Sequence, residues 1–131
     1  MTVAYCIETP TRFSRRTCAV GTAIAKGTIL KTATPNTVSA STGAHEIFGG
    51  IAWMEKSDTT STTEITVALD GVWGILCSAG AITIGQDVVI SGADLITVYT
   101  TLDGEKGEVV GKAMEAGAGS TTIMVRVNCL I

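Results

Sequence analysis

The chain has few charged residues and very little histidine, proline or aromatic side chain. Of its 131 residues, 16% are charged and 5% are aromatic, and the sequence contains 2 Pro and 1 His. A free-standing domain normally carries about 25% charged residues, so we expect other protein, including copies of this chain, to cover part of the surface. The 9 Lys and Arg are outnumbered by 12 Asp and Glu, whereas nucleic-acid-binding surfaces are basic. Nucleic acid is therefore not an expected partner.

Long apolar runs are also missing, although the mean hydropathy of +0.41 is high. A membrane-spanning helix needs roughly 18 to 20 consecutive apolar residues, and Gly, Thr or a charged residue interrupts every run in this sequence. The first ten residues do not combine a charged segment with a following apolar segment, so no signal peptide is predicted. We expect synthesis in the cytoplasm and no membrane partner.

Residues for catalysis are sparse. His45 is the single candidate imidazole base, and no G-x-S-x-G motif accompanies it. Several Asp residues lie at predicted turns, where their side chains stabilise the turn itself. The glycines of Gly117-Ala-Gly119 lead into a predicted strand, whereas phosphate-binding loops lead into a helix. The sequence therefore predicts no catalytic residue and no cofactor, and we do not expect an enzyme.

The 4 cysteines do not form a recognisable metal motif. They have no C-x-x-C spacing, and one His is too few for the familiar zinc patterns, so no metal site is predicted. Cysteine pairing stays open, because four cysteines allow three disulfide connectivities. Synthesis in the cytoplasm favours free thiols. The four residues are Cys6, Cys18, Cys77 and Cys129.

What the sequence does contain is β-forming residues, because Val, Ile and Thr make up about a third of the chain. Three hairpins are predicted from alternating apolar runs separated by turn residues: 64–69 with 72–77 around Asp70-Gly71, 87–90 with 95–99, and 109–114 with 121–127. A further turn is predicted at Asp103-Gly104, and polar loops at 34–43 and 56–63. This pattern predicts an all-β fold, a compact small barrel or sandwich.

The sequence also contains an internal duplication. The segment from Gly21 to Leu30 resembles the segment from Gly80 to Val88, with one residue fewer in the second copy. Two further pairs of similar segments follow in the same order, 50–54 with 111–114 and 65–69 with 123–127. We therefore predict one domain over residues 19–131, built from two diverged β-units at about 19–76 and 78–128 that pack about a shared core.

Residues 1–18 precede the duplicated part and are predicted to form an extended N-terminal arm. The arm holds a basic cluster with one aromatic residue, namely Arg12, Phe13, Arg15 and Arg16. Two interpretations stay open: a solvated leader, or a segment that binds the sheet edge and acidic groups of a partner. If the segment is a partner-binding arm, removal of residues 1–17 should leave a folded oligomer that no longer binds its partner. Trp53 and Trp73 lie within apolar runs, which favours a role in the core or in subunit contacts.

The motif G-x-x-I-x-x-G-x-x-L at Gly21, Ile24, Gly27 and Leu30, the repeated Gly-x-Ala segment and the closing hairpin carry a resemblance. The chain resembles the head decoration proteins, or capsid cement proteins, of tailed viruses. The resemblance implies a β-rich domain that forms a homotrimer on the outer surface of the expanded capsid in the virion. There it would clamp neighbouring major capsid proteins, with Thr2 to Thr17 as the capsid-binding arm. The cysteines and the Arg-rich arm depart from the family.

An alternative is a carbohydrate- or receptor-binding β module of a viral fibre or tail. Such a module needs exposed aromatic rings on a shallow face. If Trp53 and Trp73 form such a face, a soluble quencher should strongly reduce their fluorescence.

Overall fold

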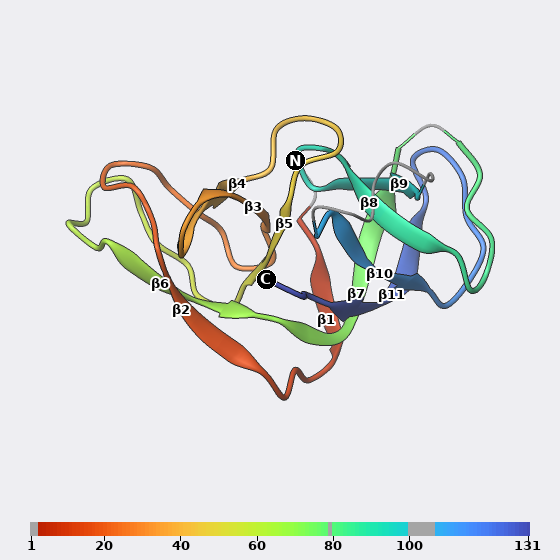
Figure 1. Cartoon of the computed structure of the whole chain (residues 1–131), viewed down its shortest axis with the longest axis horizontal. Coiled ribbons are helices and arrows are strands. Elements are labelled where there is room, and N and C mark those ends of the chain that lie inside the picture. The colour runs from red at the N-terminus through yellow and green to blue at the C-terminus, as the bar shows by residue number, and fades with distance from the viewer. Residues whose placement is uncertain (1–2, 79, 100–106) are drawn as a thin grey trace.

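A computed structural model describes residues 3–78, 80–99 and 107–131 (Figure 1). Its described residues form eleven β-strands and contain no helix. The prediction of an all-β barrel fold made of two units is therefore confirmed. Thr2, the first residue of the expected capsid-binding segment, and the expected turn at Asp103-Gly104 lie outside the described residues.

The strands close into two barrels that lie side by side, the first at the left of Figure 1 and the second at the right. The first barrel has the strand order β2-β4-β3-β5-β6, and the second has the order β7-β9-β8-β10-β11. The first contains β2 (Phe13–Thr17), β3 (Ile29–Thr34), β4 (Thr37–Ala40), β5 (Phe48–Ala52) and β6 (Glu64–Ala68). The second contains β7 (Asp70–Cys77), β8 (Asp87–Gly92), β9 (Leu95–Val98), β10 (Val109–Ala113) and β11 (Thr122–Asn128). The remaining strand, β1 (Tyr5–Glu8), pairs with β7 between the two barrels.

The barrels correspond strand for strand, and even their parallel pairs match. β2 pairs with β4 in parallel, as β7 pairs with β9, while the other pairs around each barrel are antiparallel. The Gly27 N–H donates to the Ala52 carbonyl at 2.8 Å, and the Gly85 N–H donates to the Ala113 carbonyl at 2.8 Å. Both glycines have positive φ, 94° and 89°, which glycine adopts without steric cost. The segments that are similar in sequence therefore hold equivalent places in the two barrels.

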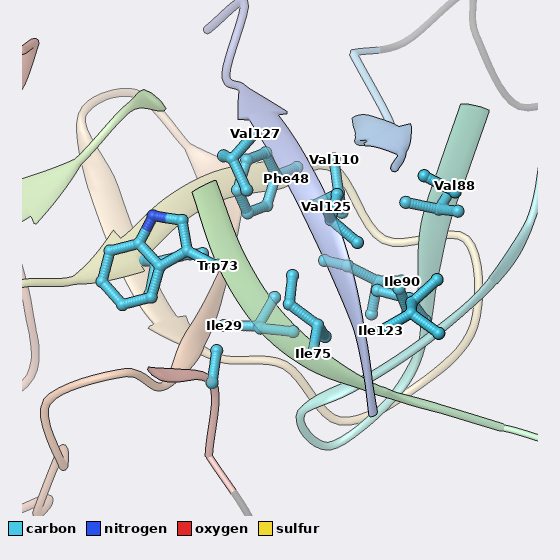
Figure 2. Packing of buried hydrophobic residues seen from close by; sticks show 14 of the residues in the cluster. Ile29, Phe48, Trp73, Ile75, Val88, Ile90, Val110, Ile123, Val125 and Val127 are labelled. Carbon is cyan, nitrogen blue, oxygen red and sulfur yellow. The ribbon is translucent and has the colours of Figure 1, made fainter. Parts of the chain in front are cut away.

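Two hydrophobic clusters fill the molecule. One fills the second barrel and extends to side chains of the first that face it, including Ile29, Phe48 and Ile51. Figure 2 shows Ile29 and Phe48 among Trp73, Ile75 and the valines of β11. The other cluster lies inside the first barrel and includes Leu30, Val38, Ile65 and Val67. The larger cluster is the shared core, because it joins the two barrels through buried apolar side chains.

The prediction of a hairpin around Asp70-Gly71 is wrong. The other two predicted hairpins are present as β8–β9 and β10–β11. Asp70 and Gly71 begin β7, and the strand before them, β6, belongs to the other barrel. Gly71 has φ 101°, and a Cβ there would lie 2.8 Å from the Glu8 carbonyl oxygen. A glycine is therefore needed at position 71 because the chain passes from one barrel to the other there and because β1 approaches closely. An Asp-Gly pair at such a position looks the same in the sequence as an Asp-Gly pair in a tight turn.

The boundary of the N-terminal arm also differs from the sequence expectation. Residues 13–17 form β2, a wall strand of the first barrel that pairs with β6 from Phe13↔Ala68 to Thr17↔Glu64. The polar segment 34–43, expected as a loop, contains β4. In both segments, pairing within a closed barrel overrides a polar sequence, because closure supplies a partner on each side of the strand.

Candidate interaction surface

The Arg-rich segment is held by its own chain rather than projecting from it. The Asp70 carboxylate accepts the Thr11 N–H and hydroxyl at 2.7 Å each and the Arg12 N–H at 3.0 Å. Burial acts to raise the pKa of Asp70, but these hydrogen bonds and the Arg12 charge lower it overall. The Arg12 guanidinium also donates to Asn128 Oδ1 at 2.6 Å. Arg12 therefore ties the start of β2 to the ends of β6 and β11.

Arg16 is directed into the protein. Its residue exposure is 7%, and its guanidinium donates to Ser14 Oγ at 3.1 Å and to the Ile131 carbonyl oxygen at 2.6 Å. The pairing Arg16↔Ile65 in the first barrel corresponds to Ile75↔Ile123 in the second. Arg16 therefore takes the place of a core isoleucine, and it is not available to a partner as the arm hypothesis requires.

Arg12, Phe13 and Arg15 are the members of the basic cluster that reach solvent, since even the paired Arg12 side chain is 47% exposed. The Arg15 side chain is 67% exposed and lies 3.4 Å from Glu64 Oε1, an exposed pair of the kind that contributes little to stability. Phe13 is 43% exposed. Of the four predicted arm residues, these three are accessible to another protein, and they lie in or directly before the barrel strand β2.

The two tryptophans lie in one aromatic cluster at the junction of the barrels. Trp73 is 1% exposed, and its indole N–H donates to the Asp70 carbonyl at 3.1 Å. Trp53 is half-buried, with ring centroids 6.1 Å from Trp73 and 5.4 Å from Phe13. The Lys26 ammonium lies 4.1 Å from the centroid of a Trp53 ring, a cation–π contact. Trp73 is thus a core residue, and Trp53 is covered on one face.

Other large apolar side chains are exposed on several elements. Tyr5 and Ile7 project from β1, and Met54 follows Trp53 after β5. The Tyr5 ring lies against Gly74, where a Cβ would be 2.3 Å from the ring, so the exposed aromatic covers a bare strand position. The exposed set is Tyr5, Ile7, Phe13, Val20, Met54, Ile84, Leu130 and Ile131. These side chains provide apolar contact surface without a single deep pocket.

The described residues also bear on metal binding, thiol chemistry and membrane insertion. Within the described ranges, no three His, Cys, Asp or Glu side chains could hold a metal ion, and no helix could cross a membrane. The cysteines are free thiols, and all but the half-buried Cys6 are buried. Burial raises the pKa of the Cys77 and Cys129 thiols, which keeps them protonated and unreactive.

The structure reveals two buried polar atoms that sequence reasoning missed. Among the described side chains, Lys56 Nζ and Glu108 Oε1 are buried without a hydrogen-bond partner. Glu108 Oε1 lies 3.9 Å from His45 Nδ1 across the barrel junction, so His45 is placed beside a carboxylate and not beside a nucleophile. Within the described residues, Lys56 forms no ion pair with a carboxylate. If the alignment of residues 50–54 with 111–114 is extended without a gap from the first residue of each segment, Lys56 aligns with Gly117. The sequence therefore contained a signal that these two positions differ.

No protein-family model matches the chain. No curated protein matches it.

Proposed function

We propose that this protein is a structural component of a virion. In this proposal it binds the outer surface of the expanded capsid of a tailed virus and stabilises the capsid by clamping neighbouring major capsid proteins. It acts as a homotrimer and catalyses no reaction. The observation that carries the proposal is the joining of two equivalent barrels through one shared core.

Two equivalent barrels suit a clamp because one chain then holds two similar surfaces at a fixed separation. The shared core and the pairing of β1 with β7 oppose relative movement of the barrels. A rigid body that contacts two shell subunits binds the assembled lattice and not the separated subunits. By mass action, such a ligand stabilises the assembled state, and three copies in a trimer would add through effective concentration.

Exposed apolar residues supply the contact surface in this proposal. Phe13 and Met54 flank the aromatic cluster at the barrel junction, and Tyr5 and Ile7 lie on β1. Aromatic anchors of this kind dominate the binding energy of protein interfaces. The arm hypothesis accordingly changes form: Phe13 and Arg15 act from the barrel wall, while Arg12 and Arg16 hold that wall in place.

The carbohydrate- or receptor-binding alternative has no specific support in the described residues. It needs the tryptophans as an open platform, whereas Trp73 is in the core and Lys26 covers one face of Trp53. We therefore retain the capsid proposal as the function of this chain.

The test is binding to expanded shells that lack this protein. We expect the purified chain to sediment with the shells and to raise the temperature at which they release an enclosed dye. Phe13→Ala should weaken binding at least about tenfold, because an aromatic interface anchor contributes more than about 1.4 kcal/mol. Ser61→Ala, at an exposed position of the loop that follows Lys56, is the matched control. A chain that stays in the supernatant would refute the proposal, and light scattering would report whether the unbound chain is a trimer.

A further inference from the structure

Lys56 is a buried cation without a counter-charge. It is 6% exposed, and its ammonium has no hydrogen-bond partner. Its backbone is fixed, because Lys56 and Ile24 exchange N–H to carbonyl bonds of 2.9 and 3.0 Å across the end of the first barrel. An ammonium needs hydrogen-bond acceptors when it leaves water, and an unpaired one destabilises the fold. The fold therefore retains Lys56 at a cost that its own side chains do not offset.

The second barrel has no such residue at the equivalent place. There Ile82 pairs with Gly117 as Ile24 pairs with Lys56. A Cβ at Gly117 would lie 2.3 Å from Ile123 Cγ2 and 3.6 Å from Cys77 Sγ, so this position faces side chains of the core at this end of the second barrel. The same backbone arrangement is thus compatible with a residue that carries no charge, and the lysine is specific to the first barrel.

A hollow lies beside Lys56 at this end of the first barrel. It has a volume of about 300 Å³ and is lined by Ala23, Ile24, Ala25, Glu55, Lys56 and Ser57. The alanine and isoleucine walls are apolar, and Ser57 has a hydroxyl whose oxygen lies 2.9 Å from Thr59 Oγ1. Glu55 is exposed whereas Lys56 is buried, so the one acidic group of the hollow lies at its solvent side.

We propose that this hollow binds a carboxylate group, with the Lys56 ammonium as its counter-charge. One ammonium and one hydroxyl between small apolar walls match a singly charged group on a short aliphatic stem. A phosphate or sulfate would need more donors, of the kind that arginine clusters supply. The flexible lysine stem allows the ammonium to turn toward an incoming carboxylate. The carboxylate has two possible sources, a free small acid or a Glu or Asp side chain of another protein.

This inference does not rest on the capsid proposal, because its test uses the isolated protein. Acetate is added at constant ionic strength, with chloride as the balancing anion, and the Lys56 side-chain resonance is followed by NMR. We expect a saturable shift of that resonance, while the resonance of Lys112, which is exposed and paired with Asp87 at 2.8 Å, serves as the internal control. Equal, non-saturating shifts of both lysines, or no shift of Lys56, would overturn the proposal.

Variants provide a second measurement. In the native protein, acetate should raise the melting temperature by several degrees, in a saturable manner. In Lys56→Met, the melting temperature without acetate should be higher than native by roughly 2 to 8 °C, because the unpaired charge is gone, and acetate should have no further effect. Glu55→Gln, the matched control on the same rim, should keep the acetate response. An acetate response that survives in Lys56→Met would contradict the assignment.

A short peptide with one Glu between Gly and Ser residues distinguishes the two sources. Half-saturation at a concentration at least tenfold below that of acetate would identify the site as a receptor for an acidic side chain of a protein. Half-saturation at the same or a higher concentration would identify a site for small carboxylates. Failure of both probes would refute the carboxylate site and leave the capsid proposal unaffected.

Discussion

The two barrels have the same strand order and equivalent backbone hydrogen bonds at Gly27 and Gly85, but they bury different polar side chains. The second barrel holds Ile75 and Gly117 where the first holds Arg16 and Lys56. The second half of the chain buries the acids Asp94 and Glu108, whereas the first buries the cations Arg16 and Lys56 together with Thr28, Thr32 and Ser41. The backbone of each five-stranded barrel is therefore specified by its strand pattern and its glycines. The interior residues are then free to diverge: Arg16 has acquired a partner in the Ile131 carbonyl oxygen, whereas the Lys56 ammonium has none among the described residues.

The outer surfaces differ as well. The register Arg15↔Thr66 corresponds to Gly74↔Met124. At Gly74 the Tyr5 ring of β1 covers the strand, whereas the Arg15 side chain faces solvent. β1 therefore covers the second barrel at a place where the first barrel is open, and the wall of the first barrel is the more available surface for a partner.

The largest expected effect comes from removing the strand that closes the first barrel. Deletion of residues 1–17 removes β1 and β2, the five paired positions with β6 and the Arg12–Asp70 contact. We expect loss of cooperative unfolding of the chain, because the exposed edges of the opened barrel and the uncovered core have no replacement partners. Urea titration followed by near-ultraviolet circular dichroism is the measurement. A native-like transition would show that these residues are a dispensable arm after all.

Residues 13–17 were predicted as part of an arm and are a barrel strand, whereas other strands were predicted correctly from the sequence. Alternating runs with intervening turn residues were sufficient for β8–β9 and β10–β11, since both strands of each pair are close in sequence. The strand β2 has no such signal, because Ser14, Arg15 and Arg16 are polar on both faces. Burial of Arg16 depends on the Ile131 carbonyl, 115 residues away, and local patterns contain no information about such a partner.

A smaller loss of stability is expected from adding a side chain at Gly117, the position in the second barrel that is equivalent to Lys56. Gly117→Ala adds a Cβ that would lie 2.3 Å from Ile123 Cγ2, and overpacking of this kind costs about 1 to 3 kcal/mol. The control is Gly43→Ala, where the nearest atom would be 3.9 Å away and the change should stay within about 0.5 kcal/mol. The shift of the urea midpoint measures both. Equal midpoints for the two variants would mean that this barrel end adapts, and that a glycine is not required there.

The smallest effect concerns the turns that follow β3 and β8, where Asn36 and Asp94 both have positive φ, 54° and 58°. Asp94 differs in that its buried carboxylate accepts the Ile29 N–H at 2.9 Å, a bond between the barrels. Burial raises the pKa of Asp94, and the hydrogen bond from Ile29 opposes that change only in part. The ionised carboxylate is therefore a destabilising group in the folded protein.

Asp94→Asn makes this turn chemically like that of the first barrel. Because the pKa of Asp94 is raised by folding, the folded state holds its proton at pH values where the unfolded state has lost it. The stability that the protonated group contributes is fully present below the unfolded pKa and is lost as pH rises through the folded pKa. Asp94→Asn should therefore match native stability at low pH and exceed it by about 1 kcal/mol at neutral pH. Unfolding free energies measured from pH 3 to pH 7 test this, and a native protein that gains stability relative to the variant as pH rises would show that the Ile29 bond outweighs burial.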